Sequence, residues 1–162
     1  MSISKLQEKP GHLIRRCQQI AVALFLDYCE PFDLTPMQYA ILHAVAAEPG
    51  LDQISIAGLV ALDRSNAARV CAALETRGLL ERALDTKDRR VRRLSISAAG
   101  KKLLDRAEPA VLQVQKALLT PLSPSQRREF IAALNIIAAA HNETSRAPQR
   151  DTTGDITLNP AP

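Results

Sequence analysis

Apolar residues recur at three- and four-residue steps along most of this chain, the spacing that places them on one face of a helix. The first such stretch runs from Gly11 to Glu30, and Pro31 follows it as a stop. The same spacing, together with the signals described next, predicts five more helices, over residues 35–49, 53–62, 64–77, 97–119 and 123–141. The chain is therefore expected to be mainly helical.

Local start and stop signals delimit these helices. The tetrapeptides TPMQ at 35–38 and SPSQ at 123–126 each offer a hydroxyl cap, a proline for the first helical position and a glutamine that bonds back. Asp63 and Ser97 are placed to cap the helices that follow them, and Gly78 is placed to end the helix before it.

Two short alternating segments, Leu79–Leu84 and Val91–Ile96, interrupt the helical pattern. Alternation on both sides of a charged loop predicts a β-hairpin, so the expected fold class is mainly α with a small β-hairpin. A short helix, a tight turn and a second helix with a basic start, followed by a charged hairpin, are typical of a winged helix–turn–helix. Such a fold lays its second helix in the major groove of double-stranded DNA.

Positive charge is concentrated in the same region. The chain of 162 residues carries 21 basic and 17 acidic side chains, a net charge of +4. Residues 64–93 hold nine of the basic and four of the acidic side chains, a local charge of +5, so the rest of the chain sums to −1. This distribution is typical of a surface that meets a nucleic-acid backbone. Aromatic residues make up only 3%, which argues against a stacking platform for single strands.

Other classes of protein are not favoured by the sequence. No apolar run is long enough to cross a membrane and the N-terminus lacks a secretion signal, so we expect a cytoplasmic protein with no membrane partner. The three cysteines and three histidines show no metal-ligand spacing. Neither a catalytic constellation nor a glycine-rich phosphate loop is visible, so neither an enzyme nor a cofactor is expected.

Several motifs of the basic region together resemble the MarR family of winged-helix regulators. Segments 55–57 (SIA), 62–70 (LDRSNAARV) and 74–82 (LETRGLLER) are similar to the core of its DNA-reading unit. The loop 85–90 (DTKDRR) resembles the family's D-x-R-D-x-R pattern, with Lys87 in place of the first Arg. Residues 96–100 (ISAAG) resemble its L-T-x-x-G pattern, with Ile96 and Ser97 in place of Leu and Thr.

This resemblance implies a homodimer, in which the first and the last two helices interleave with those of the partner subunit. Two reading units related by a two-fold axis imply a pseudo-palindromic operator, with repression as the expected sense of regulation. The domain organisation expected is a flexible N-terminus at 1–10, a dimerisation helix at 11–34, the winged helix–turn–helix region at 35–100, dimerisation helices at 101–143 and a disordered tail at 144–162.

Candidate DNA contacts follow from these assignments. Ser65, Asn66 and Arg69 fall early in the predicted recognition helix, on the face expected to meet base edges, where Asn suits adenine and Arg suits guanine. By resemblance, Arg90 is the wing-tip residue for the minor groove, and Asp88 holds the shape of that tip. The other basic candidates are Arg64, Arg77, Lys87 and Arg89. Arg64 and Arg77 are expected to contact phosphates.

A further resemblance concerns a small-molecule effector. Residues 11–25 (GHLIRRCQQIAVALF) and 34–40 (LTPMQYA) are similar to a branch of the family that controls the breakdown of aromatic acids. This similarity implies release from DNA by a small aromatic acid or its acyl-CoA thioester, bound in an apolar pocket with a few basic groups. The candidate effector-binding residues are His12, Arg15, Arg16, Ile20 and Tyr39.

Two alternatives stay open. Cys17, close to Arg15 and Arg16, resembles in position the reactive thiol of peroxide-sensing members, but it also belongs to the apolar stripe of its helix, where a buried inert thiol is the commoner outcome. It is a redox candidate. The second alternative is a winged-helix module that binds a protein and not DNA.

Overall fold

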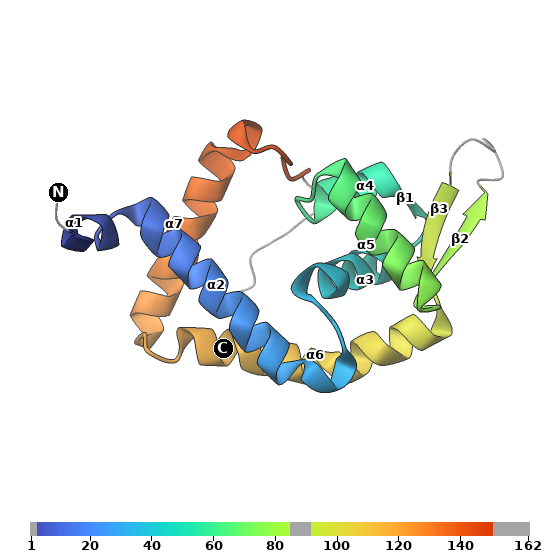
Figure 1. The fold of residues 1–162 in the computed structure, drawn as a ribbon, viewed down its shortest axis with the longest axis horizontal. Coiled ribbons are helices and arrows are strands. Elements are labelled where there is room, and N and C mark those ends of the chain that lie inside the picture. The colour runs from blue at the N-terminus through green and yellow to red at the C-terminus, as the bar shows by residue number, and fades with distance from the viewer. Residues whose placement is uncertain (1–2, 85–91, 151–162) are drawn as a thin grey trace.

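The computed structural model describes residues 3–84 and 92–150 (Figure 1). In chain order the elements are α1 (Ile3–Gln7), α2 (Pro10–Tyr28), η1 (Glu30–Phe32), α3 (Pro36–Ala47), β1 (Leu51–Asp52), α4 (Gln53–Leu59), α5 (Arg64–Thr76), β2 (Leu80–Leu84), β3 (Arg92–Ile96), α6 (Ala98–Leu119), α7 (Pro124–Ala140) and η2 (Asn142–Thr144). The expected fold class, mainly α with a small hairpin and a winged helix–turn–helix, is confirmed.

The predicted start and stop signals are confirmed. Thr35 and Gln38 form a reciprocal capping box at the start of α3, and Ser123 and Gln126 form one at the start of α7. Asp63 and Ser97 each accept a hydrogen bond from the backbone N–H three residues later, and Gly78 has a φ of +68° after α5. These elements form where predicted because their caps need only residues within the same turn.

The sheet has one strand more than the predicted hairpin. Strands β2 and β3 pair antiparallel, with Leu80 opposite Ile96, and β1 pairs antiparallel with β3, with Leu51 opposite Leu94. The order is therefore β1-β3-β2. Strand β1 was not predicted, because two residues, of which Asp52 is also the cap of α4, carry no alternating pattern of their own.

The core lies under the helix–turn–helix. Side chains from α3, α4 and α5 pack with Leu94 of β3, with the C-terminal end of α2 and with the inner face of α6. Phe25 is buried in α2, whereas the residues before it on that helix are exposed or half-buried. None of the side chains of α7 is buried. In Figure 1, α1, the start of α2 and α7 extend to one side, away from the helix–turn–helix.

Both ends of the described chain differ from the prediction. The segment expected to be flexible through residue 10 contains α1, and α2 begins at Pro10, because proline suits the first position of a helix. The segment expected to be disordered from residue 144 is hydrogen-bonded to the body as far as Arg150, whose backbone N–H donates to the Gly58 carbonyl at 3.0 Å. Arg150 and Gly58 are far apart in the sequence, so the polar residues and prolines around residue 144 give no indication of this contact.

Candidate nucleic-acid interface

Helices α4 and α5 form the helix–turn–helix. Asp52 caps α4 by accepting from the Ser55 backbone N–H at 2.8 Å, and α4 ends in a turn where Ala61 has a φ of +51°. The Leu62 backbone N–H then donates to the Ala57 carbonyl at 2.9 Å, which closes the turn. The chain is thereby redirected within four residues into α5.

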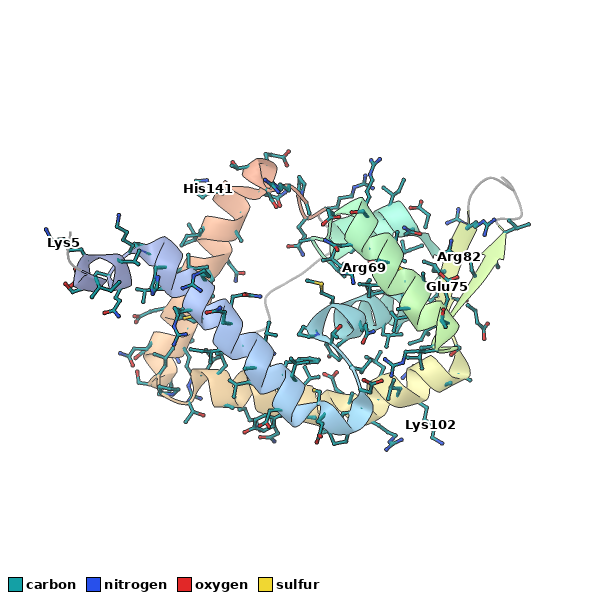
Figure 2. The ribbon with its side chains drawn as sticks, viewed as in Figure 1. Lys5, Arg69, Glu75, Arg82, Lys102 and His141 are labelled. Atoms are coloured by element: carbon teal, nitrogen blue, oxygen red, sulfur yellow. The ribbon has the colours of Figure 1, made fainter. Side chains whose placement is uncertain are left out.

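Burial of one side of α5 leaves its other side exposed. Ala67, Val70, Cys71 and Leu74 are buried against the core. Arg64, Ser65 and Arg69 are exposed and Asn66 is half-buried, so these four predicted DNA contacts lie together on the first two turns of the helix. Figure 2 shows the Arg69 side chain on α5.

A hydrogen-bonded chain orders these side chains. Asp63 accepts from the Asn66 backbone N–H at 2.9 Å, from the Ser65 hydroxyl at 2.8 Å and from the Asn66 amide at 2.5 Å. The Arg69 guanidinium then donates to the Asn66 side-chain oxygen at 3.2 Å. These donors, the Asn66 backbone N–H first, lower the pKa of Asp63 from its ordinary 3.8 to about 2. The helix cap thus also orients the two candidate base-reading side chains.

Replacing Asp63 by alanine is expected to destabilise the fold at neutral pH and much less at pH 2, because the lowered pKa means that the carboxylate stabilises the folded state only while it is ionised. Its contribution is present above about pH 4 and is lost as the pH falls toward about 2. Thermal unfolding at both pH values measures this. Asp63→Asn keeps the cap acceptor and serves as the control with a pH-independent cap. If Asp63→Ala destabilises the fold equally at both pH values, the ionised carboxylate of Asp63 is not the group that stabilises the folded state.

Arg77 has protein partners at the other end of α5. Its guanidinium forms an ion pair with the Asp33 carboxylate at 3.3 Å and donates to the Asp33 carbonyl at 2.6 Å. It also lies 3.5 Å from the Gln38 side-chain oxygen. Arg77 therefore attaches the end of α5 to the start of α3, and its predicted contact with a phosphate stays a prediction.

The sheet that follows α5 carries further basic side chains. Arg82 of β2 forms an ion pair with Glu75 of α5 (Figure 2). Arg93 of β3 donates to the Gly50 carbonyl at 2.7 Å. Four predicted wing residues, Lys87, Asp88, Arg89 and Arg90, lie outside the described residues, so their predicted roles stay predictions.

The predicted effector-binding residues fall into two places. Tyr39 of α3 packs with Phe25 and with His43, and its hydroxyl donates to Glu108 of α6 at 2.5 Å. Burial and the hydrogen bond to Glu108 raise the pKa of Tyr39. Sequence reasoning missed Glu108, since nothing local marks a carboxylate in the middle of a long helix as the partner of a distant tyrosine.

The remaining candidates lie on the N-terminal half of α2, where Arg15, Arg16 and Ile20 are exposed and His12 is half-buried. Phe25 lies ten positions after Arg15 on α2, which corresponds to a rise of about 15 Å along the helix. A single chain therefore does not bring the two arginines to the ring of Tyr39.

The three cysteines differ in exposure. Cys17 is exposed, whereas Cys29 and Cys71 are buried. Burial raises the pKa of the Cys29 thiol, and burial with the nearby Glu75 carboxylate raises that of Cys71 to about 11. The interpretation of Cys29 and Cys71 as packing residues agrees with these environments.

Neither a metal site nor a membrane span is present among the described residues. Within 3–84 and 92–150, no group of three or more His, Cys, Asp or Glu side chains is placed to hold a metal ion. Over the same ranges, no helix combines the length and apolar character needed to span a bilayer.

An exposed polar helix in second position of a helix–turn–helix, followed by a small antiparallel sheet, defines a winged-helix DNA-binding protein. The MarR family model matches residues 32–91, from the last residue of η1 to the residue before β3. The transcriptional regulator HosA of Escherichia coli O157:H7 is 32% identical over 126 residues, which are 78% of this chain and 92% of HosA.

Solved structures agree in fold. CouR, a transcriptional repressor determined on a 23-mer DNA duplex, is 31% identical with a TM-score of 0.79 and covers 85% of this chain and 98% of its own. BpsR of Bordetella bronchiseptica is 26% identical with a TM-score of 0.78 and covers 81% and 94%. This chain belongs to the MarR family. It is a DNA-binding transcriptional regulator and not an enzyme, as its motifs predicted.

Proposed function

We propose that the protein is a homodimeric repressor of a pseudo-palindromic operator and that a small aromatic acid or its acyl-CoA thioester releases it. The observation that carries the dimer is the uncovered apolar face of α7. Its exposed residues follow the helical period and are Phe130, Ile131, Leu134 and Ile137. Leu13, Ile14 and Ile20 of α2 are exposed in the same way. Apolar faces of this kind need a cover, and a second copy supplies a matching one.

Operator symmetry follows from the dimer. Each copy contributes one α5, and a two-fold axis places the two helices in successive major grooves. Half-sites about one helical turn apart are therefore expected. The exposed side chains of α5 read each half-site, and arginines around the helix contact its backbone.

Support for the effector comes from the surroundings of Tyr39 and from a relative. An open hollow of about 450 Å³, mostly apolar, is lined by Tyr39 and His43 of α3 and by Leu59 and Ala61 of the helix–turn–helix. An effector seated there touches both the helix that holds Tyr39 and the turn that sets the direction of α5. DNA binding by BpsR is regulated by 6-hydroxynicotinic acid, an aromatic acid.

The basic candidates on α2 complete this proposal only in a dimer. His12, Arg15 and Arg16 extend from the exposed end of α2, beyond the core of their own chain. A second copy covering the apolar face of α2 brings such basic side chains toward a neighbouring hollow, where they bind the carboxylate or the phosphates of the effector.

Fluorescence anisotropy with DNA from the regulator's own upstream region tests the proposal. One aromatic acid or thioester of a panel is expected to weaken DNA binding about 5- to 150-fold, the range of a typical coupling between two sites. Free coenzyme A and an aliphatic acid of equal charge are the controls and are expected to leave binding unchanged. Release by peroxide that is lost in Cys17→Ser, with no response to any acid, contradicts this effector and favours the thiol alternative, which the exposure of Cys17 leaves open.

A further inference from the structure

The chain after α7 returns to the helix–turn–helix, and residues 142–150 are here called the C-terminal strap. The Arg150 backbone N–H donates to the Gly58 carbonyl at 3.0 Å, and the Gln149 amide donates to the Leu59 carbonyl at 3.2 Å. Both carbonyls belong to the last turn of α4, where the backbone carbonyls of a helix need hydrogen-bond donors from outside the helix. Figure 1 shows the strap, in red, ending beside α4 and the start of α5.

A reciprocal pair of hydrogen bonds holds the strap in shape. The Asn142 amide donates to the Gln149 carbonyl at 2.9 Å, and the Gln149 backbone N–H donates to the Asn142 side-chain oxygen at 2.8 Å. This pair closes the turn that carries Arg146. The strap is thus fixed at its base by Asn142 and at its end by α4.

The strap and the helix–turn–helix border an open hollow of about 600 Å³ beside the first turn of α5. Three arginines line it, Arg64 from α5 and Arg146 and Arg150 from the strap, together with the acids Asp63 and Glu143. The Asp63 carboxylate is already occupied by the donors of the helix cap. Within residues 3–84 and 92–150, none of the three guanidinium groups has a hydrogen-bond or ion-pair partner.

Gly58 permits the close approach of the strap. A Cβ at this position would lie 2.8 Å from Cδ and 2.9 Å from Cγ of Arg150, so the Arg150 side chain runs directly across α4. Its charged end is thereby directed along the helix–turn–helix, where the hollow lies.

We propose that Arg64, Arg146 and Arg150 together bind one phosphate of the DNA backbone. Guanidinium groups bind phosphate oxygens in pairs, and the start of α5 adds the positive end of a helix dipole. A recognition helix in the major groove has backbone phosphates beside its first turn. The inference rests on the proposed function, because α5 must lie on DNA for the hollow to meet a phosphate.

The salt dependence of DNA binding tests this site, because each phosphate contact contributes about 0.9 to the slope of log affinity against log salt. Arg146→Gln/Arg150→Gln keeps most of both side-chain stems and removes both charges. This variant is expected to lower the slope by about 0.9 and to weaken operator and unrelated DNA equally, by about tenfold. Lys102→Gln is the control, since Figure 2 shows Lys102 on α6, on the side away from α5. It is expected to keep the slope of the wild type.

Three outcomes overturn the inference. An unchanged slope in the double variant removes the phosphate contact. If Asn142→Ala weakens DNA binding and the double variant does not, the strap only supports α4 structurally. The third outcome has two parts. Inorganic pyrophosphate raises the melting temperature of the wild type but not that of the double variant, and the two proteins have equal slopes of log affinity for DNA against log salt. The hollow is then a site for free phosphate groups and not for the DNA backbone. A wild type that binds no DNA at low salt is a different result and contradicts the proposed function itself.

Discussion

Replacing Leu134 by glutamate is expected to leave the protein monomeric and to weaken operator binding by about a hundredfold or more. Leu134 lies in the middle of the apolar face of α7 and is 40% exposed in the single chain. A carboxylate at the centre of a dimer interface must be desolvated without a partner, which costs more than the interface gains there. A monomer then loses the advantage of two linked reading units, which is worth about 10²–10⁴ in affinity.

Sedimentation and anisotropy on the same samples measure this result. Because none of the residues of α7 is buried within the chain, the variant is expected to keep the helical content of the wild type. Leu134→Met conserves volume and apolar character and is expected to remain dimeric. A dimeric Leu134→Glu protein with full operator affinity contradicts the assignment of α7 to the dimer interface.

Replacing Arg69 by alanine is expected to remove much of the preference for the operator over unrelated DNA. A bidentate pair between a side chain and a base contributes about 1–3 kcal/mol of discrimination, or about 5- to 150-fold. Arg69 is exposed on α5 and held by Asn66, whose amide donates to the cap residue Asp63. The guanidinium is therefore oriented before DNA binds, which reduces the entropy lost on forming the contact.

Competition binding with operator and scrambled DNA distinguishes base reading from a phosphate contact. Arg69→Ala is expected to weaken the operator complex and to leave the scrambled complex nearly unchanged. The melting temperature is expected to stay that of the wild type, because the side chain covers no part of the core. An equal loss on both DNA molecules reassigns Arg69 to the backbone. The double variant of the strap, Arg146→Gln/Arg150→Gln, is expected to lose affinity equally on both DNA molecules. Arg69→Ala and the strap variant therefore serve as controls for each other.

The helix–turn–helix was predictable because its signals are local. Asp63 caps α5 through groups within three residues, and the periodic burial of Ala67, Val70 and Leu74 fixes which side chains remain exposed. The two capping boxes, at Thr35 and Ser123, likewise rest on residues three positions apart. A resemblance of motifs in the same stretch then indicated the family, which the comparisons confirm.

Other parts of the candidate site depend on residues far apart in the sequence. Glu108 meets Tyr39, and Asp33 meets Arg77, only because α6 and α3 pack on the same core as α2 and α5. The strap reaches Gly58 only because the chain after α7 returns to the helix–turn–helix. No periodicity or spacing along the chain marks such pairs, since the pattern around each partner is already accounted for by the helix or loop in which it lies.

The sequence by itself determined the order of the elements, the ends of most helices and the exposed face of α5, because caps and helical periodicity act over one or two turns. Only the tertiary structure decided which distant groups meet: β1 with β3, Tyr39 with Glu108 and the strap with α4. Packing of the shared core makes these contacts, and the free energy that drives it depends on the area removed from water rather than on any local order of residues.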